Sequence, residues 1–225
     1  MIKKGIILAG GMGTRMSPLT KAVNKQLLPL YDKPLLYYPL SVLMLAGIKK
    51  ILIIVNKGQL NQFRKILPEK NNLGISLDYK EQVRPGGLPE AFTIGEKFIN
   101  KDSVSLILGD NFFYGQSLTK ILKKNINLNS GAKIFIHPVK NPQLYGVATL
   151  NKNNKVSKLI EKPKKTKSNL AVTGLYFFDN KVVELTKKLR PSKRGELEII
   201  DLLNIYKRKN KLKAELIGRG GSWLD

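Results

Sequence analysis

Short runs of Val, Ile and Leu alternate with stretches of helical period along the first half of the chain. Apolar runs of this length are typical of strands buried on both faces of a parallel sheet. The pattern predicts strands at 4–9, 50–55, 75–79, 104–108 and 133–139, and helices at 34–46, 59–67, 89–98 and 117–126. This alternation predicts an α/β fold with a Rossmann-like, mixed and mostly parallel sheet that has helices on both faces.

Three residues mark helix ends within this pattern. Pro34 and Pro89 suit the first turn of a helix, and Gly47 suits the first position after one. In an open parallel sheet, ligands bind beyond the carboxyl ends of the strands. The loops that are expected to meet along this rim are 10–25, 82–87 and 109–111.

The second half of the chain has a different pattern of apolar segments. Shorter β-like pieces lie at 146–150, 155–161 and 172–178, followed by helices at 182–189 and 197–209 and a strand at 213–217. These pieces predict a smaller β-rich lobe over the rim. A chain of 225 residues suits a single domain. We therefore predict one domain over 1–225, with a core at 1–140 and the smaller part at 141–225.

Composition narrows the chemistry. The chain has no cysteine and a single histidine, so disulfides, iron–sulfur clusters, thiolate zinc sites and Cys or Ser–His catalysis are disfavoured. The first apolar run is too short for a signal segment or a membrane span, which predicts a cytoplasmic protein and no membrane partner. The net charge of +24 is spread along the chain, which favours a solvated lysine surface over a nucleic-acid site.

A glycine-rich segment follows the first predicted strand, with the sequence Gly10-Gly11-Met12-Gly13-Thr14-Arg15. Its spacing fits neither the dinucleotide fingerprint nor the Walker pattern. Glycines allow backbone N–H groups to approach an anion, and Arg15 and Lys25 add positive charge. The segment therefore predicts a phosphate-binding loop, the alternative being a tight turn with incidental basic residues.

Several motifs together resemble the sugar-phosphate nucleotidylyltransferases. They include the glycine-rich segment, Lys-Gln-Leu-Leu-Pro at 25–29, Leu-Gly-Asp-Asn at 108–111, Tyr-Gly-Val at 145–147, Glu-Lys-Pro at 161–163, Arg-Gly-Glu-Leu-Glu at 194–198 and the last residues, 218–225. The resemblance covers essentially the whole chain and is strongest to members that use dTTP and glucose 1-phosphate at the start of dTDP-rhamnose and related deoxysugar synthesis. It implies that the sugar phosphate attacks the α-phosphorus of the triphosphate and that pyrophosphate leaves in line.

The resemblance also implies roles for particular residues. Arg15, Lys25, Lys162 and Asp110 are expected to be catalytic. The residues expected to bind the nucleotide are Gly10, Gly11, Gly13, Thr14, Arg15, Gln26, Gln82 and Gly87. The residues expected to bind the sugar phosphate are Asn111, Tyr145, Gly146, Glu161, Lys162, Val172 and Arg194. A Gln side chain offers a donor and an acceptor together, which suits the edge of thymine or uracil and makes Gln82 the expected reader of the base.

A magnesium ion is the expected cofactor. Asp110 follows a predicted strand at the rim, and a carboxylate there suits Mg²⁺, which takes one or two protein carboxylates along with phosphate oxygens. The resemblance supplies Asp225 as its partner. By position alone, an Asp that follows a strand is more often a turn former or a helix cap than a metal ligand.

Two departures from the family pattern leave alternatives open. Pro89-Glu90 stands where relatives have Ala-Gln, which leaves dTTP and UTP both possible and admits another hexose 1-phosphate. Relatives also continue past Trp-Leu-Asp with a helical region that supports a tetramer. The chain is accordingly expected to be either a fragment or a short form, a homo-oligomer is only one possibility, and a basic nucleotide- or polyanion-binding remnant without activity is the non-enzymatic alternative.

Overall fold

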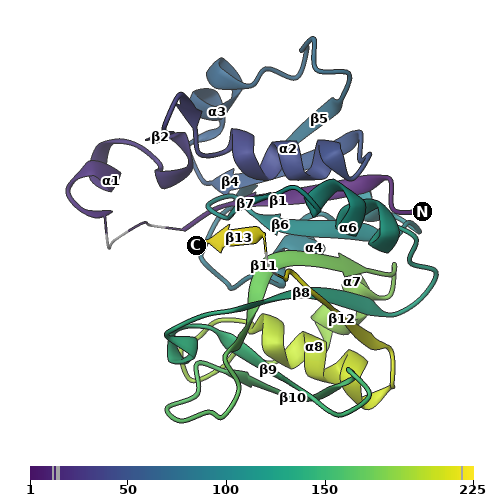
Figure 1. Ribbon diagram of the computed structural model, residues 1–225. Helices are drawn as coiled ribbons and strands as arrows, with labels where there is room; N and C mark the ends of the chain where they lie inside the picture. The colour runs from purple at the N-terminus through teal and green to yellow at the C-terminus, as the bar shows by residue number, and fades with distance from the viewer. Residues whose placement is uncertain (12, 14–15, 219) are drawn as a thin grey trace.

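The computed structural model describes residues 1–11, 13, 16–218 and 220–225, and a nine-stranded mixed sheet runs through it (Figure 1). One half of the sheet is parallel, in the order β5 (Ser76–Gln82), β4 (Lys50–Asn56), β1 (Lys4–Ala9) and β6 (Val104–Leu108). Residues 51–55 of β4 are buried throughout, as expected for a strand covered on both faces. The predicted α/β class and parallel core are confirmed.

The other half of the sheet is mainly antiparallel. Its central strand, β11 (Leu170–Phe178), pairs with β6, with β8 (Ala132–Pro138) and with β9 (Gly146–Leu150). Strand β10 (Val156–Glu161) pairs with β9, and β12 (Leu212–Leu216) pairs in parallel with β8. The β-rich part is therefore continuous with the core sheet, because the long, buried strand β11 belongs to both.

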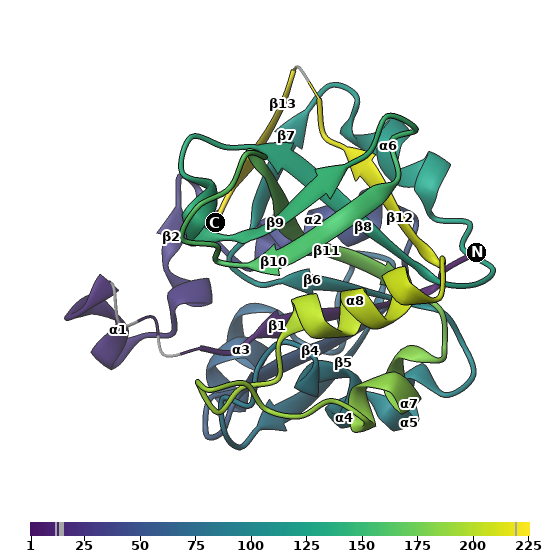
Figure 2. The same cartoon turned by 90° about the horizontal axis from the view of Figure 1, so that it is seen from below.

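Helices cover both faces of the sheet, as predicted. On one face, α2 (Tyr37–Leu45), α3 (Leu60–Ile66) and α6 (Leu118–Asn125) pack in a core with Leu43, Phe63 and Leu122. On the other face lie α4 (Glu90–Ile94), α5 (Glu96–Ile99), α7 (Val182–Lys187) and α8 (Ile199–Arg208) (Figure 2). None of the described helices is both long and apolar enough to cross a membrane.

One predicted helix boundary was wrong and one predicted helix is in two pieces, whereas Gly47 and Pro89 lie at helix ends as predicted. Gly47, with φ +83°, follows the end of α2 as predicted. Pro34 lies instead in β3 (Lys33–Pro34), which forms a hairpin with β2 (Pro29–Leu30), so α2 begins three residues later, at Tyr37. The predicted helix 89–98 is broken at Gly95, where an added Cβ would lie 2.9 Å from Ile6 of the sheet.

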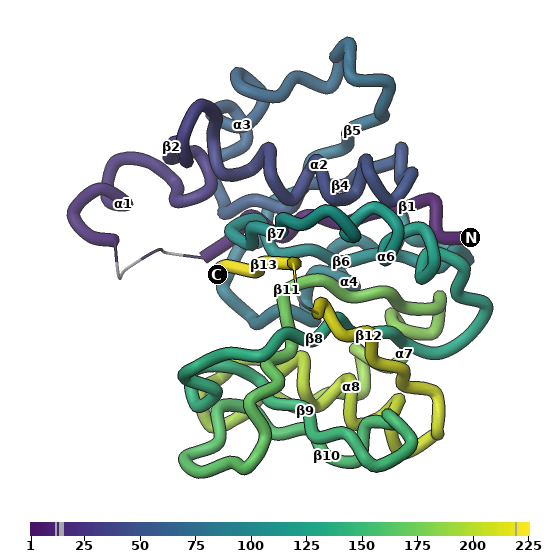
Figure 3. The backbone as a smooth tube through the Cα atoms, in the orientation of Figure 1, coloured from purple at the N-terminus to yellow at the C-terminus, as the bar shows by residue number. Residues whose placement is uncertain are grey.

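The end of the chain forms a strand that the sequence analysis missed. Strand β13 (Gly221–Leu224) pairs antiparallel with β7 (Phe112–Gly115), which follows directly on the Asp110-Asn111 turn. Figure 3 shows that this last segment lies beside β7, near the carboxyl ends of the parallel strands. The short elements α1 (Leu19–Ala22), η2 (Lys25–Leu27) and η3 (Pro142–Leu144) complete the fold.

Backbone contacts join the loop after β5 to the segment before α8. Gly87 forms a parallel bridge with Leu197, and the Leu197 N–H donates to the Gly86 carbonyl at 2.9 Å. Gly87 has φ +96°, and an added Cβ would collide with the Leu197 backbone. Only glycine permits this approach, which holds two loops together above the rim.

We expect Gly87→Ala to lower the free energy of unfolding by about 3 kcal/mol or more, because positive φ and a backbone clash act together. The matched control is Gly58→Ala, at φ +83° with no atom within 4 Å of the added Cβ, which should cost only about 1 kcal/mol. Urea denaturation measures both. Equal losses would show that the Leu197 contact contributes nothing.

Candidate active site

A trough of three adjoining cavities runs along the rim of the sheet. The largest has a volume of about 570 Å³ and shares Leu88, Leu108, Glu196 and Asp225 with a middle cavity of about 230 Å³. A third cavity, also of about 230 Å³, shares Gly10, Gly11, Gln26 and Asp110 with the middle one. We call the three together the trough, with the third cavity as its glycine end and the largest as its Glu161 end.

The trough brings most of the predicted site residues together. Its glycine end and middle are lined by Gly10, Gly11, Gly13, Lys25, Gln26, Gln82, Gly87, Asp110 and Asp225. Its Glu161 end is lined by Tyr145, Gly146, Glu161, Lys162, Val172 and Arg194. Thr14 and Arg15 lie outside the described residues. The three predicted loops therefore meet along one rim, as expected for parallel strands.

Asn56 fixes the glycine-rich loop and was missed by the sequence analysis. Its Oδ1 accepts from the Gly11 N–H at 3.1 Å, and its Nδ2 donates to the Gly11 carbonyl at 3.0 Å. The Thr20 hydroxyl donates to the Gly13 carbonyl at 2.8 Å. Since β4 lies beside β1 in the sheet, a polar residue at the end of β4 is the sequence signal that could have identified Asn56.

A buried amide next to this loop has an unused acceptor. Gln26 is 3% exposed and its Nε2 donates to the Gly10 carbonyl at 3.2 Å. Its Oε1 has no hydrogen-bond partner among the described residues. An unsatisfied buried acceptor is costly, so a ligand with a hydroxyl or N–H donor would be favoured here.

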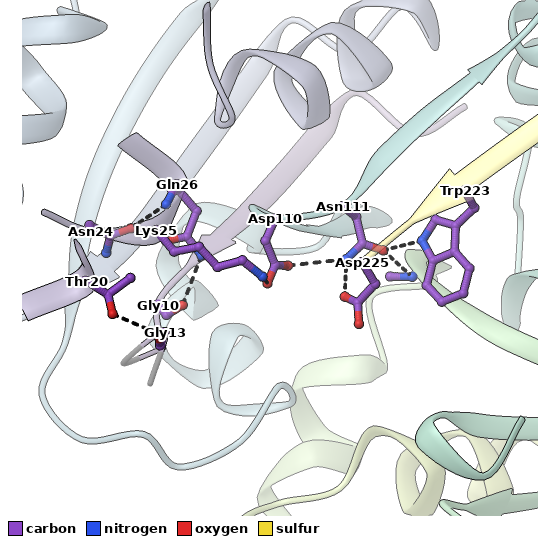
Figure 4. A network of polar contacts seen from close by, with 11 residues as sticks. Gly10, Gly13, Thr20, Asn24, Lys25, Gln26, Asp110, Asn111, Trp223 and Asp225 are labelled. Carbon is purple, nitrogen blue, oxygen red and sulfur yellow. Dashed lines mark hydrogen bonds and ion pairs between the residues drawn. The ribbon is translucent and has the colours of Figure 1, made fainter. Parts of the chain in front are cut away.

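Lys25 and Asp110 form an ion pair across the trough, with Nζ and Oδ2 2.9 Å apart (Figure 4). Their side chains are only 19% and 24% exposed. Asn24 holds the short η2 turn that presents Lys25, because its Oδ1 accepts from the Gln26 N–H at 2.9 Å. The sequence thus sets a cation and a carboxylate in contact at the glycine end of the trough.

Asn111 lies behind the trough and joins several segments (Figure 4). Its Oδ1 accepts from Trp223 Nε1 at 2.6 Å and from the Gly174 N–H at 2.9 Å. Its Nδ2 contacts Asp225 Oδ1 at 2.8 Å and Asp110 Oδ1 at 3.3 Å. Asn111 is fully buried and does not line the trough. The expected contact of Asn111 with a sugar stays a prediction, and in this structure its amide contacts both aspartates.

The two aspartates fit a magnesium ion. Both line the middle cavity, and Asn111 Nδ2 lies between one oxygen of each. Among the described residues no group of three His, Cys, Asp or Glu side chains could hold a metal. A pair of carboxylates facing open volume suits Mg²⁺, which keeps water and phosphate oxygens as its other ligands.

Arg194 and two glutamates form the charged wall of the Glu161 end. Arg194 Nη2 lies 2.8 Å from Glu198 Oε2 and 3.5 Å from Glu161 Oε1. The hydrogen bond to Glu198 raises the pKa of the Arg194 guanidinium. Burial, and secondarily Glu198, raises the pKa of the Glu161 carboxyl, while Lys162 and Arg194 oppose the rise.

Glu198 was missed by the sequence analysis, although its spacing of four residues from Arg194 was the available signal. Helix α8 begins at Ile199, two residues after its predicted start, and Leu197 bridges to Gly87 instead. The Ser192 hydroxyl donates to Glu198 Oε1 at 2.7 Å, which fixes this carboxylate from the other side.

Apolar groups form the rest of this end. Trp223 is 7% exposed, and the Tyr145 ring packs edge-on against it with centroids 5.1 Å apart. Tyr145 also lines the cavity, so packing and cavity lining coincide in one residue. Leu88, Val172 and Ile200 add apolar surface. A cavity with one apolar wall and one charged wall suits a polar ligand with a hydrophobic face, such as a pyranose.

Comparison with known proteins identifies a family that matches nearly the whole chain. The family model described as nucleotidyl transferase matches residues 4–225. The chain is 53% identical over 222 residues to a glucose-1-phosphate thymidylyltransferase of Neisseria meningitidis, covering 99% of this chain and 77% of that protein. It is 48% identical to the protein of the same name from Mycolicibacterium smegmatis, again over 99% of this chain and 77% of the relative.

Solved structures share the fold over the whole chain. A Bacillus anthracis structure described as a glucose-1-phosphate thymidylyltransferase in complex with sucrose has a TM-score of 0.90 at 38% identity, and the match covers 99% of this chain and 89% of that one. A UDP-glucose pyrophosphorylase complexed with UDP-glucose has a TM-score of 0.85 at 26% identity, covering 100% and 93% of the two chains.

We expect Asn111→Ala to lower the free energy of unfolding by about 3 kcal/mol and to shift Trp223 fluorescence to longer wavelength, because water enters the space that the amide leaves and solvates the indole. The chain has a single tryptophan, so the signal is unambiguous. The control is Asn125→Ala, another buried amide, whose Nδ2 donates to the Ile121 carbonyl at 2.7 Å. An unshifted spectrum for Asn111→Ala would contradict the assignment.

The raised pKa of Glu161 predicts a pH-dependent stability difference. Its ordinary value is 4.5, and a folded-state pKa above this means that the folded protein holds the proton more tightly. Its contribution to stability is therefore full below about pH 4.5 and is lost as pH rises through the folded pKa. Glu161→Gln should be more stable than the parent near neutrality and lose that advantage in acid. Urea denaturation across this range tests it, and a pH-independent difference would contradict it.

Proposed function

This chain belongs to the nucleotidyl transferase family, and we propose that it catalyses the glucose-1-phosphate thymidylyltransferase reaction. It transfers the nucleotidyl group of dTTP to glucose 1-phosphate, which yields dTDP-glucose for dTDP-sugar biosynthesis and releases pyrophosphate. The trough is the observation that carries this proposal, because it joins a glycine-lined end to a Glu161 end with two aspartates between them.

The glycine end binds the triphosphate. Gly10, Gly11 and Gly13 line this end and let the backbone approach an anion closely, and Lys25 adds a cation. Thr14 and Arg15 belong to the same loop by sequence. Gln82 and Gly87 line the middle cavity and take the base, and the unpaired Gln26 Oε1 suits a ribose hydroxyl.

The Glu161 end binds glucose 1-phosphate. Lys162 and Arg194 neutralise its phosphate, while the Glu161 carboxylate accepts hydrogen bonds from pairs of sugar hydroxyls. Tyr145, Gly146 and Val172 shape the space around the ring. The Glu198 carboxylate supports this assignment, because it accepts three hydrogen bonds from Arg194, which lines the cavity.

Transfer follows from this placement. A phosphate oxygen of glucose 1-phosphate forms a bond to the α-phosphorus of dTTP as the bond from that phosphorus to the bridging oxygen of pyrophosphate breaks. No covalent nucleophile is required, since such a displacement depends on positioning and on neutralising charge. Lys25, now paired with Asp110, is available to stabilise the negative charge that develops on the departing pyrophosphate.

Asp110 and Asp225 would hold the magnesium ion of this reaction. When bound there, Mg²⁺ neutralises phosphate oxygens and orients the triphosphate. Asn111 donates to a carboxylate oxygen on each aspartate and so fixes their separation before any ligand arrives. The two aspartates would thereby present two carboxylates to the ion in a fixed arrangement.

The proposal is tested by pyrophosphate release with Mg²⁺ and glucose 1-phosphate, using dTTP, UTP or CTP in turn. We expect release to be fastest with dTTP. A clear preference for UTP would replace the nucleotide in the proposal, and release with none of the three would contradict the activity.

We expect Asp110→Asn to lower kcat roughly a thousandfold, the order seen when a group that stabilises transition-state charge is removed. The control is Asp102→Asn, which removes the same charge from a surface pair with Lys4. That variant should keep near-parent turnover. A similar loss in both variants would show that the effect comes from overall charge rather than from the site.

A further inference from the structure

We infer that Glu90 is a positioning residue that fixes the orientation of the Gln82 carboxamide and so selects against cytosine. The inference rests on the proposed function in one respect, that Gln82 faces the base. It concerns a position outside the trough wall, since Glu90 does not line any of the three cavities.

The contact between the two side chains is short and partly buried. Gln82 ends β5 and is 6% exposed, and its Nε2 donates to Glu90 Oε2 at 2.5 Å. The same carboxylate oxygen accepts from the Gly86 N–H at 3.1 Å. Glu90 is the first residue of α4, so the helix start holds its side chain under the Gln82-to-Gly87 loop.

A carboxylate decides which way the amide points. The nitrogen and oxygen of a Gln side chain are nearly alike in shape, and hydrogen bonds alone distinguish the two orientations. An ionised carboxylate only accepts, so the Gln82 nitrogen must face Glu90. A neutral Gln at position 90 could accept or donate and would permit both orientations.

The Gln82 oxygen is consequently turned toward the nucleotide loop. A Cβ added to Gly10 would lie 2.7 Å from Gln82 Oε1 and 3.9 Å from its Cδ, so the oxygen is the part of the amide nearest this glycine. Gly10 and Gln82 both line the middle cavity. The amide therefore presents an acceptor to whatever occupies that cavity.

An acceptor at this point distinguishes pyrimidines by N3. Thymine and uracil have a hydrogen on N3 and can donate to the Gln82 oxygen. Cytosine has a lone pair at N3, which would face another lone pair. A carboxamide that is free to turn would offer its NH₂ to cytosine instead. Glu90 removes that option, so it disfavours cytosine and leaves thymine and uracil equivalent at this contact.

The test measures equilibrium binding of dTTP and dCTP, which differ only in the base, by titration calorimetry with Mg²⁺ present. In Glu90→Gln we expect the ratio of the dCTP Kd to the dTTP Kd to fall about tenfold, chiefly through tighter dCTP binding. The matched control is Glu96→Gln at the start of α5, which removes the same charge from a surface pair with Lys187 and should leave the ratio unchanged.

A double variant distinguishes a positioning role of Glu90 from a general structural role. If Glu90 acts through Gln82, then adding Glu90→Gln to Gln82→Ala should leave the Kd ratio as it is in Gln82→Ala alone. An equal loss of affinity for both nucleotides in Glu90→Gln, or an unchanged ratio, would overturn the inference. So would the absence of binding of either nucleotide by the parent. Binding without pyrophosphate release by the parent would contradict the proposed activity alone, and the Kd ratios would still decide the role of Glu90.

Discussion

The buried side chain of Asn111 is the constraint on which the site depends. A fully buried amide is tolerated only when its polar atoms are satisfied, and here the partners come from distant parts of the chain. Gly174 from β11, Trp223 and Asp225 from the last residues, and Asp110 beside it all contact the one amide. Gly174 must lack a side chain, because a Cβ would meet Asn111 Cγ at 2.6 Å. The packing requirement of one amide therefore fixes the positions of both aspartates.

Two of the cations that line the trough are already paired with carboxylates. Lys25 contacts Asp110 at the glycine end, and Arg194 contacts Glu198 and Glu161 at the other. Each cation is held by a carboxylate, so its side chain has lost most of its freedom before a phosphate arrives. Preorganised charges stabilise a developing anion without the reorganisation that water requires. The net charge of +24 adds a general attraction for polyphosphates, and these few pairs determine where in the trough the positive charges lie.

Local patterns predicted the framework well, and long-range contacts explain what they missed. The strands at 4–9 and 104–108 follow directly from short, wholly apolar runs. The break at Gly95 depends on how closely the helix approaches Ile6, which periodicity does not reveal. Pro34 fits a helix start equally well as a hairpin position, and the pairing with Pro29 decides between them. Motifs identified most of the trough, whereas Asn56 and Glu198 act through other residues and so have no ligand motif of their own.

The continuity of the sheet determines how the two substrates can meet. A separate β-rich lobe would set the distance between triphosphate and sugar phosphate through a linker, and that distance would vary. Here β11 pairs with β6 of the parallel half and with β9 and β8 of the other half, so strand hydrogen bonds set it. The bridge between Gly87 and Leu197 also joins the two ends of the site, through the loops above the rim. In-line displacement is sensitive to ångström changes in approach, and a site whose two ends are joined both by a sheet and by a loop contact meets that requirement before substrates bind.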